Sequence, residues 1–163
     1  TNNTGDSRVA ALTGSVTIDG QSYSLTSVAL SQEDYCVDPD TQILTPTGTI
    51  QAAKIKVGDV IRTKHEFTLE WMQDIIIEVK RVKAYKKLLL MFENGDEFIA
   101  SAQHRIMKGG EFISLSKLQV SDKIDDNTIV AIEDLGEGDV VKINSEKSNT
   151  YMSSNMILNH NYK

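Results

Sequence analysis

The chain has 163 residues, of which 40% are hydrophobic, and its 17 basic and 23 acidic side chains give a formal net charge of −6 at pH 7. This length suits one compact domain with a short appendage. The acidic balance argues against a nucleic-acid partner, because such binding needs Lys and Arg to neutralise phosphates. No apolar run approaches the roughly 20 residues that span a bilayer, and residues 1–12 lack the layout of a signal peptide. We therefore expect no membrane association and a monomeric, cytoplasmic protein as the chain is given.

Residues 1–35 are rich in Ser, Thr and Gly and contain a single basic residue, Arg8. One hairpin is predicted around Asp19-Gly20. We interpret this stretch as a flanking segment that belongs to another protein region. The working domain is then predicted to span residues 36–161, with residues 162–163 as a second flank.

From Cys36 onward, short apolar runs rich in β-branched residues are separated by Gly, Asn and Asp. This pattern is typical of a mostly antiparallel, all-β protein. The clearest hairpin turns at Asn94-Gly95, which can supply the two positive φ angles of a type I′ turn. Short helical turns are expected at 51–56 and 115–119, and no long amphipathic helix is predicted.

An internal repeat relates residues 41–61 to residues 104–124 at a constant offset and without gaps. Two copies are too few for a solenoid and predict two interlocked β halves with pseudo-twofold symmetry. That arrangement would bring the strand after Cys36 close to the strand that carries His104. A shared strand-and-turn pattern without duplication is the alternative. The matched pairs are Ile43 and Ile106, Ile50 and Ile113, Lys54 and Lys117, Ile55 and Leu118, Val57 and Val120, Asp59 and Asp122, and Ile61 and Ile124.

Cys36 is the only cysteine, so it cannot form an internal disulfide and is a candidate reactive thiol. A buried, inert cysteine is the alternative. Beside His104 of the S-A-Q-H segment 101–104, the thiol could belong to a protease dyad, a metal site or a site that acts on its own backbone. Three histidines and one cysteine at irregular spacing do not form a recognisable zinc set, so we expect neither a metal nor a cofactor. His65 lies in a polar loop and is expected to be solvated.

The pair His160-Asn161 near the other end suggests backbone cleavage. An Asn side-chain nitrogen can attack its own carbonyl carbon, form a succinimide and cut the chain before Tyr162. The neighbouring imidazole can protonate the departing amine, a task suited to a group with an ordinary pKa of about 6.5. Taken alone, this pair is weak evidence for cleavage, since in most proteins such residues are simply polar side chains exposed at the surface.

The corresponding reaction at Cys36 is an N-to-S acyl shift, in which the thiol attacks the carbonyl of Tyr35 and converts the amide into a thioester. The step is uphill, so the amide nitrogen must be protonated as it leaves and the oxyanion must be stabilised. His104 is the natural proton donor. Ser101 is the natural hydrogen-bonding partner of the scissile amide.

Three segments together resemble the splicing motifs of inteins: C-V-D-P-D-T-Q-I-L-T-P-T-G (36–48), S-A-Q-H (101–104) where inteins usually carry Thr-x-x-His, and N-M-I-L-N-H-N (155–161). The resemblance covers residues 36–161 and implies the horseshoe-shaped, all-β Hint fold of a mini-intein without a homing endonuclease. It also implies that the partners of the chain are its own flanking segments, the exteins. The catalytic residues it implies are Cys36, Ser101, His104, His160 and Asn161, with Tyr35 and Tyr162 flanking the two scissile bonds.

The match departs from standard inteins at Tyr162, where the family has Cys, Ser or Thr. A phenol at the end of a rigid ring cannot close the small cyclic transition state of transesterification. In this respect the chain resembles the type A bacterial intein-like domains, in which cleavage at either junction is typical and splicing is thought to use direct attack by a released amine. A second departure places Lys142 and Asn149 where many inteins have an acidic residue and a His in the strand before the last, so Asn cyclisation is expected to be slower or assisted by other residues.

The sequence thus predicts autocatalytic, single-turnover self-processing rather than an enzyme that turns over. Two alternatives remain open. A Cys-His hydrolase acting in trans is one, although no nucleophile elbow and no Asn that orients the base can be identified. A non-catalytic β structural module is the other.

Overall fold

The computed structural model describes residues 14–18, 21–25 and 35–161, and the chain divides into two units, residues 1–33 and residues 34–163. In the first unit, strands β1 (Gly14–Ile18) and β2 (Gln21–Leu25) pair antiparallel. The predicted hairpin is therefore confirmed, while its turn residues, Asp19 and Gly20, lie outside the described residues. The role of this unit as a flank stays a prediction.

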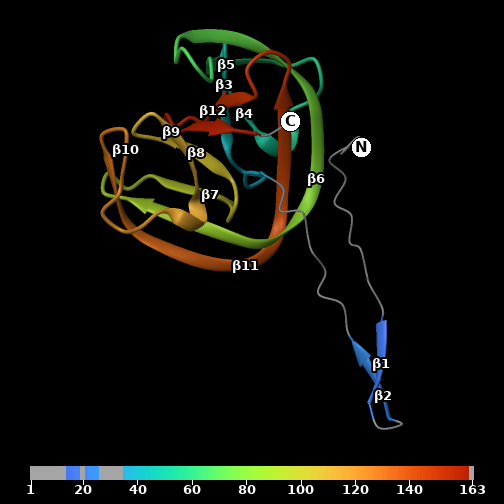
Figure 1. Cartoon of the computed structure of the whole chain (residues 1–163). Helices are drawn as coiled ribbons and strands as arrows, with labels where there is room; N and C mark the ends of the chain where they lie inside the picture. Colours follow the sequence, from blue (N-terminus) through green and yellow to red (C-terminus); the bar gives the residue numbers. More distant parts are fainter. Residues whose placement is uncertain (1–13, 19–20, 26–34, 162–163) are drawn as a thin grey trace. The chain divides into compact units, whose positions relative to one another are not determined.

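The second unit is built almost entirely of strands, so the predicted all-β class is confirmed (Figure 1). The two expected helical turns are 3₁₀ turns of three residues each. Within the described residues no helix is long and apolar enough to cross a membrane. In chain order the elements are β3 (Gln42–Thr45), β4 (Gly48–Gln51), η1 (Ala52–Lys54), β5 (Val60–Lys64), β6 (Trp71–Phe92), β7 (Glu97–Ser101), β8 (Arg105–Lys108), β9 (Glu111–Ser114), η2 (Leu115–Lys117), β10 (Lys123–Ile124), β11 (Asn127–Ser145), β12 (Thr150–Met152) and β13 (Leu158–His160).

Two long strands, β6 and β11, frame this unit. They pair antiparallel over nearly their whole lengths, with register shifts that include one on each side of Gly136. Such irregularities bend and twist a strand pair, and the two ribbons follow one curved path around the shorter strands (Figure 1). At Gly138 an added Cβ would lie 2.8 Å from Cδ of Lys87, so a larger residue there would require the Lys87 side chain to move.

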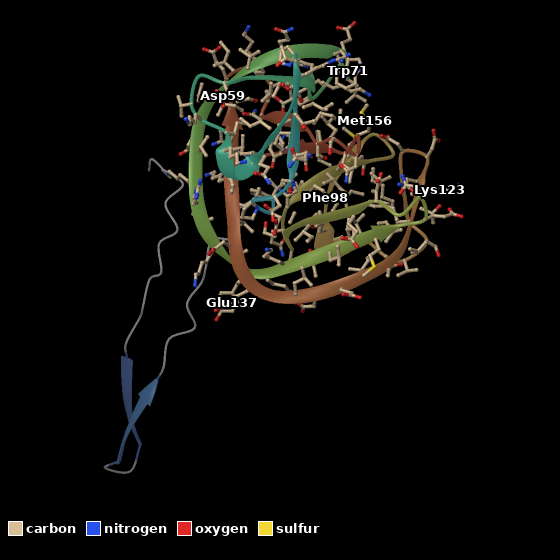
Figure 2. All side chains as sticks on the ribbon, turned by 180° about the vertical axis from the view of Figure 1, so that it is seen from behind. Asp59, Trp71, Phe98, Lys123, Glu137 and Met156 are labelled. Atoms are coloured by element: carbon tan, nitrogen blue, oxygen red, sulfur yellow. The ribbon has the colours of Figure 1, made fainter. Side chains whose placement is uncertain are left out.

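Three short strands, β5, β7 and β10, pair with β6 or β11, and the others form two further sheets inside this bend. The order of the four-stranded sheet is β12-β13-β8-β9, and β3 pairs with β4 and also bridges Ser153 through Ile43. Buried aliphatic side chains from these sheets meet those of the long strands and form the core. Figure 2 shows the core residue Phe98 among these side chains and Trp71, which is 42% exposed, at the margin.

The predicted repeat is confirmed element by element. β3, β4 and η1 have the same lengths as β8, β9 and η2, and each copy then continues into a strand, β5 or β10. The N–H of Ala52 donates to the carbonyl of Thr41 at 2.8 Å, and in the second copy Leu115 donates to His104 at 2.9 Å. Matched hydrogen bonds at matched positions indicate one fold used twice, rather than a shared strand pattern.

The two copies meet at a short antiparallel bridge between Val37 and Ala100, which are themselves equivalent positions. On either side of the bridge, Asp38 N–H donates to the facing strand at 3.0 Å and Ser101 N–H donates to the carbonyl of Cys36 at 2.9 Å. The pseudo-twofold axis therefore passes between the segment that begins at Cys36 and the end of β7. This places the lone thiol beside the second copy.

The turn between β6 and β7 differs from the prediction. Gly95 has a φ of 88°, whereas Asn94 is not among the residues with positive φ. Phe92 N–H donates to the Asp96 carbonyl and Gly95 N–H donates to the Phe92 carbonyl, both at 2.9 Å. The predicted type I′ turn is therefore wrong, and the hairpin has a three-residue loop that ends on a left-handed glycine.

Candidate functional site

Cys36 is fully buried at the centre of the second unit. Its strand is held on both sides, because Val37 bridges Ala100 and also exchanges backbone hydrogen bonds of 3.1 and 2.8 Å with Val141. The N–H of Cys36 donates to Ser101 Oγ at 3.2 Å. The hydroxyl that the sequence assigns to the scissile amide therefore touches that amide.

His104 is fully buried close to the same peptide bond. Burial lowers the pKa of its imidazole from 6.5 to about 4, while contacts with the Asn159 side chain and the Tyr35 backbone oppose this shift. A backbone group that raises the pKa of an imidazole is a carbonyl, since an N–H would disfavour the cation. His104 therefore faces the carbonyl of Tyr35, the group that the acyl shift would attack. Nδ1 makes no hydrogen bond of ordinary geometry within the described chain.

Asn159 orients His104, and sequence reasoning did not identify it. Its Nδ2 donates to the carbonyls of Ile157 at 2.8 Å and Tyr151 at 3.3 Å, which leaves Oδ1 as the atom 2.9 Å from His104 Nε2. Because Oδ1 can only accept, Nε2 carries the proton in the neutral ring and Nδ1 keeps its lone pair. The residue lies within the terminal N-M-I-L-N-H-N segment, but only the antiparallel pairing of β13 with β8 brings it to His104.

Aromatic side chains close the space around this imidazole. The ring centroids of Phe98 and Tyr151 lie 6.1 and 6.2 Å from that of His104. Tyr151 is buried, and its hydroxyl has no hydrogen-bond partner within the described residues. Burial, and secondarily the nearby Cys36, raises the pKa of Tyr151 well above its ordinary value of 10. The thiol therefore lies in a low-dielectric environment from which water is largely excluded.

His160 lies at the end of β13, 8% exposed. Its Nε2 is 3.0 Å from Glu66 Oε2, and its ring centroid is 4.4 Å from that of Phe112. Glu66 is a second residue that sequence reasoning missed. It stands in the loop between β5 and β6, and a single Glu in a polar loop gives no signal that it meets a residue so distant in the sequence.

Asn161 follows directly and is fully buried. Its backbone N–H donates to the carbonyl of Asn149 at 2.8 Å, and its Nδ2 donates to the carbonyl of Ile143. Its Oδ1 is buried without a hydrogen-bond partner in the described part of the chain. Tyr162, on the other side of the predicted scissile bond, lies outside the described residues.

Lys142 does not lie on the strand before the last, and its correspondence to the acidic residue of other inteins stays a prediction. The strand before β13 is β12, whereas Lys142 lies on β11, where it is opposite Lys80 in the register with β6. Asn149 precedes β12 by one residue and does contact Asn161 through its carbonyl. The acidic group near Asn161 is supplied instead by Glu66, whose Oε1 accepts from Asn149 Nδ2 at 3.3 Å.

His65 is also better defined than expected. Its Nδ1 accepts the N–H groups of Phe67 at 3.3 Å and Thr68 at 3.4 Å. The imidazole thus organises the loop that carries Glu66, rather than being merely solvated.

The comparisons with known proteins agree with this geometry. No protein-family model matches the sequence, and no curated protein matches it significantly. Among solved structures, a bacterial intein-like domain from Clostridium thermocellum superposes with a TM-score of 0.69 at 24% identity, covering 80% of this chain and all of that one. The gp41-1 intein gives a TM-score of 0.64 at 24% identity over 77% of this chain and 98% of its own. A DnaB intein from Synechocystis sp. PCC 6803 gives 0.69 at 17% identity over 78% of this chain and 99% of its own.

The chain has the Hint fold of the inteins. The predicted fold class is thereby confirmed, including the pseudo-twofold architecture that the repeat indicated independently. These likenesses show the fold, and the roles of individual residues in this Hint unit stay predictions.

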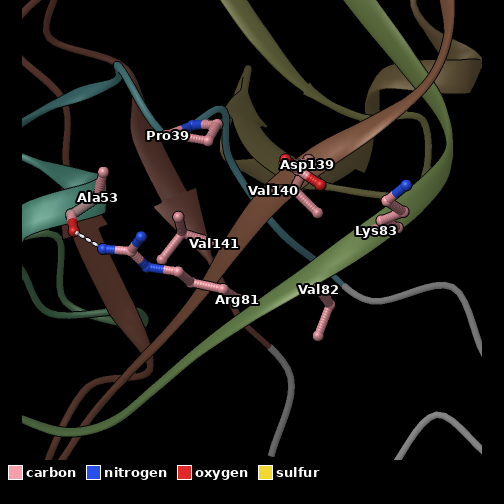
Figure 3. A pocket seen from close by; sticks show the side chains of 8 residues that line it. All are labelled: Pro39, Ala53, Arg81, Val82, Lys83, Asp139, Val140 and Val141. Atoms are coloured by element: carbon pink, nitrogen blue, oxygen red, sulfur yellow. Dashed lines mark hydrogen bonds between the residues drawn. The ribbon is translucent and has the colours of Figure 1, made fainter.

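Three cavities lined by described residues lie away from the predicted site residues. A cavity of about 420 Å³ is lined by Arg81, which donates to the carbonyl of Ala53 (Figure 3). Two others, of about 520 and 240 Å³, lie elsewhere. None of the three is lined by Cys36, Ser101 or His104. Within the described residues no group of three or more His, Cys, Asp or Glu is arranged to hold a metal ion.

Proposed function

We propose that the chain is a self-processing protein that breaks its own backbone before Cys36 and after Asn161. The observation that carries the proposal is the environment of Cys36: a fully buried thiol whose own amide donates to Ser101 Oγ at 3.2 Å, beside an imidazole that faces Tyr35. A thiol this enclosed can react only with groups held beside it. The group held there is its own peptide bond, and the Hint fold supports the same interpretation.

At the upstream junction, His104 acts first as a base. With its pKa near 4, the ring is neutral at pH 7 and can take the thiol proton on Nδ1. The Cys36 sulfur then bonds to the carbonyl carbon of Tyr35, the carbon–nitrogen bond breaks, and the imidazolium returns the proton to the Cys36 nitrogen. The products are a Tyr35 thioester and a free Cys36 amine, with no atom gained or lost. Ser101 holds the departing nitrogen.

At the downstream junction, Asn161 supplies the nucleophile. The hydrogen bond from Nδ2 to the Ile143 carbonyl fixes the side-chain amide in place. Nδ2 bonds to the carbonyl carbon of Asn161, the bond to the Tyr162 nitrogen breaks, and the proton lost from Nδ2 is balanced by one gained on that amine. In this proposal His160 delivers that proton, and a succinimide remains on the chain.

The balance between outcomes follows from Tyr162, whose side chain cannot accept the acyl group from Cys36. Cleavage at either junction is therefore the expected main result. Inefficient splicing can also occur, if the released α-amine of Tyr162 attacks the thioester. The partners of the reaction are the flanking segments of the same chain, so each molecule acts once.

Mass spectrometry of the intact chain with and without dithiothreitol tests the proposal. Release of residues 1–35 that depends on the thiol reports the thioester, and loss of Tyr162-Lys163 reports Asn161 cyclisation. Cys36→Ala should abolish only the first event and Asn161→Ala only the second. If neither event occurs in the unaltered chain, or if Cys36→Ala leaves the thiol-dependent release intact, the proposal is wrong.

A mixing experiment separates self-processing from a hydrolase acting in trans. The unaltered chain is incubated with an isotope-labelled Cys36→Ala, Asn161→Ala chain. We expect the labelled chain to stay whole, because the site residues are enclosed. Cleavage of the labelled chain would favour the Cys-His hydrolase instead.

A further inference from the structure

We propose that Glu66 is a positioning residue for the downstream cleavage, holding His160 and Asn149, which flank Asn161, with the two oxygens of one carboxylate. Oε2 lies 3.0 Å from His160 Nε2, and Oε1 accepts from Asn149 Nδ2 at 3.3 Å. The inference rests on the proposed function, since it assigns a role within that site.

The contact with His160 selects which ring nitrogen handles the proton. A carboxylate can only accept, so the neutral imidazole must carry its proton on Nε2 to bond Glu66. Nδ1 is then left as the nitrogen that exchanges a proton with the reacting groups. The side chains of His160 and Glu66 are 11% and 15% exposed, so water competes little for this bond. The ring of Phe112, 4.4 Å away between centroids, restricts the imidazole further.

The contact with Asn149 reaches Asn161 by a second route. Asn149 has a φ of 51°, a left-handed conformation that Asn tolerates better than most residues. In this conformation its carbonyl accepts the N–H of Asn161 at 2.8 Å while its side chain bonds Glu66. The same carboxylate thus fixes both the backbone entering Asn161 and the imidazole that precedes it.

The loop that carries Glu66 is held firmly enough for this role. His65 N–H donates to the carbonyl of Glu70, and Leu69 N–H donates to the carbonyl of His65, both at 2.9 Å. The preceding residue, Lys64, accepts the hydroxyl of Thr150 at 2.6 Å through its carbonyl, which docks the loop onto β12. A side chain on such a support keeps its geometry while a neighbouring bond reacts.

The test compares Glu66→Ala and Glu66→Gln with Glu70→Ala in the full chain. Glu70 is an exposed acid of the same loop, so its variant controls for loss of charge and for loop damage. In each sample, mass spectrometry follows the loss of Tyr162-Lys163 and the thiol-dependent release of residues 1–35. We expect Glu66→Ala to slow the first event by about 10- to 100-fold, as is usual when a group that orients a metal-binding His is lost, and to leave the second within about twofold. Glu66→Gln keeps one acceptor oxygen and should be intermediate, while Glu70→Ala should match the unaltered chain.

Two outcomes would overturn the inference while leaving the proposed function standing. One is a Glu66→Ala chain that loses Tyr162-Lys163 at the normal rate. The other is an equal slowing of both events, which would indicate general structural damage.

A readout independent of cleavage uses the Asn161→Ala chain, which cannot cyclise. Nitrogen NMR of its His160 ring should show the Nε2–H tautomer. Adding Glu66→Gln should produce a mixture of the two tautomers, and adding Glu70→Ala should leave the Nε2–H tautomer unchanged. If the tautomer responds in this way but the unaltered chain never loses Tyr162-Lys163, the proposed function fails and the placement of Glu66 stands. A ring unaffected by Glu66→Gln contradicts the inference.

Discussion

Residues 41–61 and 104–124 fold into the same hairpin, 3₁₀ turn and strand, yet at the first position of each copy only the second has an imidazole. Thr41 and His104 stand at equivalent places, and each accepts the N–H of the first residue of its 3₁₀ turn, at 2.8 and 2.9 Å respectively. The backbone around the two residues is therefore matched while their side chains differ. The comparison indicates that the repeat supplies the scaffold, and that the chemistry we propose depends on individual side chains of one copy.

The residues three places earlier show the same division. Asp38 forms an ion pair with Lys87, and both side chains are about 15% exposed or less. Its counterpart, Ser101, instead accepts the N–H of Cys36 at 3.2 Å. In the first copy, Asp38 thus anchors the strand that begins at Cys36. In the second copy, Ser101 contacts the Tyr35–Cys36 peptide bond, which we propose is broken.

The most direct test of this difference between the two copies removes the side chain of His104 and that of Thr41 in turn. His104→Ala should slow the thiol-dependent release of residues 1–35 by about 10²- to 10⁴-fold, the usual contribution of a positioned acid or base. Thr41→Ala removes a side chain from the same backbone environment and should leave the rate within about threefold. Quantitative mass spectrometry over time measures both rates. Equal losses in the two variants would show that the position matters for folding and not for chemistry.

The two copies should also differ in how they respond to acid. The pKa of His104 is about 4 in the folded chain against 6.5 when unfolded, so between these values the unfolded state binds more protons and stability rises with pH. The contribution of neutral His104 to the free energy of unfolding is therefore complete above about pH 6.5. About 3 kcal/mol of that free energy is lost as the pH falls toward 4, because one pKa unit corresponds to about 1.4 kcal/mol. Thr41 contributes nothing of this kind.

Urea unfolding of a Cys36→Ala, Asn161→Ala chain at pH 7 and pH 4.5 checks this prediction, because that chain cannot process itself. Adding His104→Gln keeps a donor for Asn159 and removes the titration, which should flatten the pH dependence. Adding Thr41→Val should leave it unchanged. An equally steep dependence with His104→Gln would assign the acid sensitivity to other groups.

Much of this comparison could be predicted from the sequence, because its signals are local or periodic. The matched isoleucines mark the core of each copy, and Ile43, Ile61 and Ile106 are fully buried. The short helical turns and the approach of Cys36 to His104 follow from the same alignment. Asn94-Gly95 marked a hairpin correctly, but the turn type depends on the register of β6 and β7, which the dipeptide does not specify.

The remaining parts of the site depend on pairings that no local pattern encodes. Asn159 reaches His104 only because β13 pairs with β8, and Glu66 reaches His160 across 94 residues of sequence. Lys142 lies on β11 and not on β12, a strand boundary that the alternating apolar pattern of this region does not reveal. Side chains that orient catalytic groups across strands are therefore the features that needed the structure.

A turn after each 3₁₀ segment offers a matched test of stability. Asp59 Oδ2 accepts the N–H of Lys56 at 2.8 Å, and Asp122 Oδ2 accepts that of Gln119 at 2.9 Å. Asp59→Ala should cost about 1 kcal/mol, the usual net value of one such hydrogen bond. Asp122→Ala should destabilise by more, because Asp122 also pairs with Lys108 at 2.6 Å. Urea unfolding measures both, and a Lys108→Ala background should make the two losses equal if the ion pair is the difference.

The smallest expected effect concerns the residue just before each of these aspartates. Gly58 and Ser121 have φ angles of 94° and 79°, and each donates its N–H to a carbonyl of the adjoining long strand at 2.8 Å. An added Cβ at Gly58 would meet nothing within 4 Å, so any cost there comes from the left-handed backbone alone. Gly58→Ser should destabilise the chain by about 1 kcal/mol, whereas Ser121→Gly should gain only a few tenths, because glycine loses more entropy on folding. If the urea midpoint falls with Gly58→Ser and rises with Ser121→Gly, both copies impose the same backbone strain. If the midpoint falls in both variants, the Ser121 side chain stabilises its turn in a way that has no equivalent at Gly58.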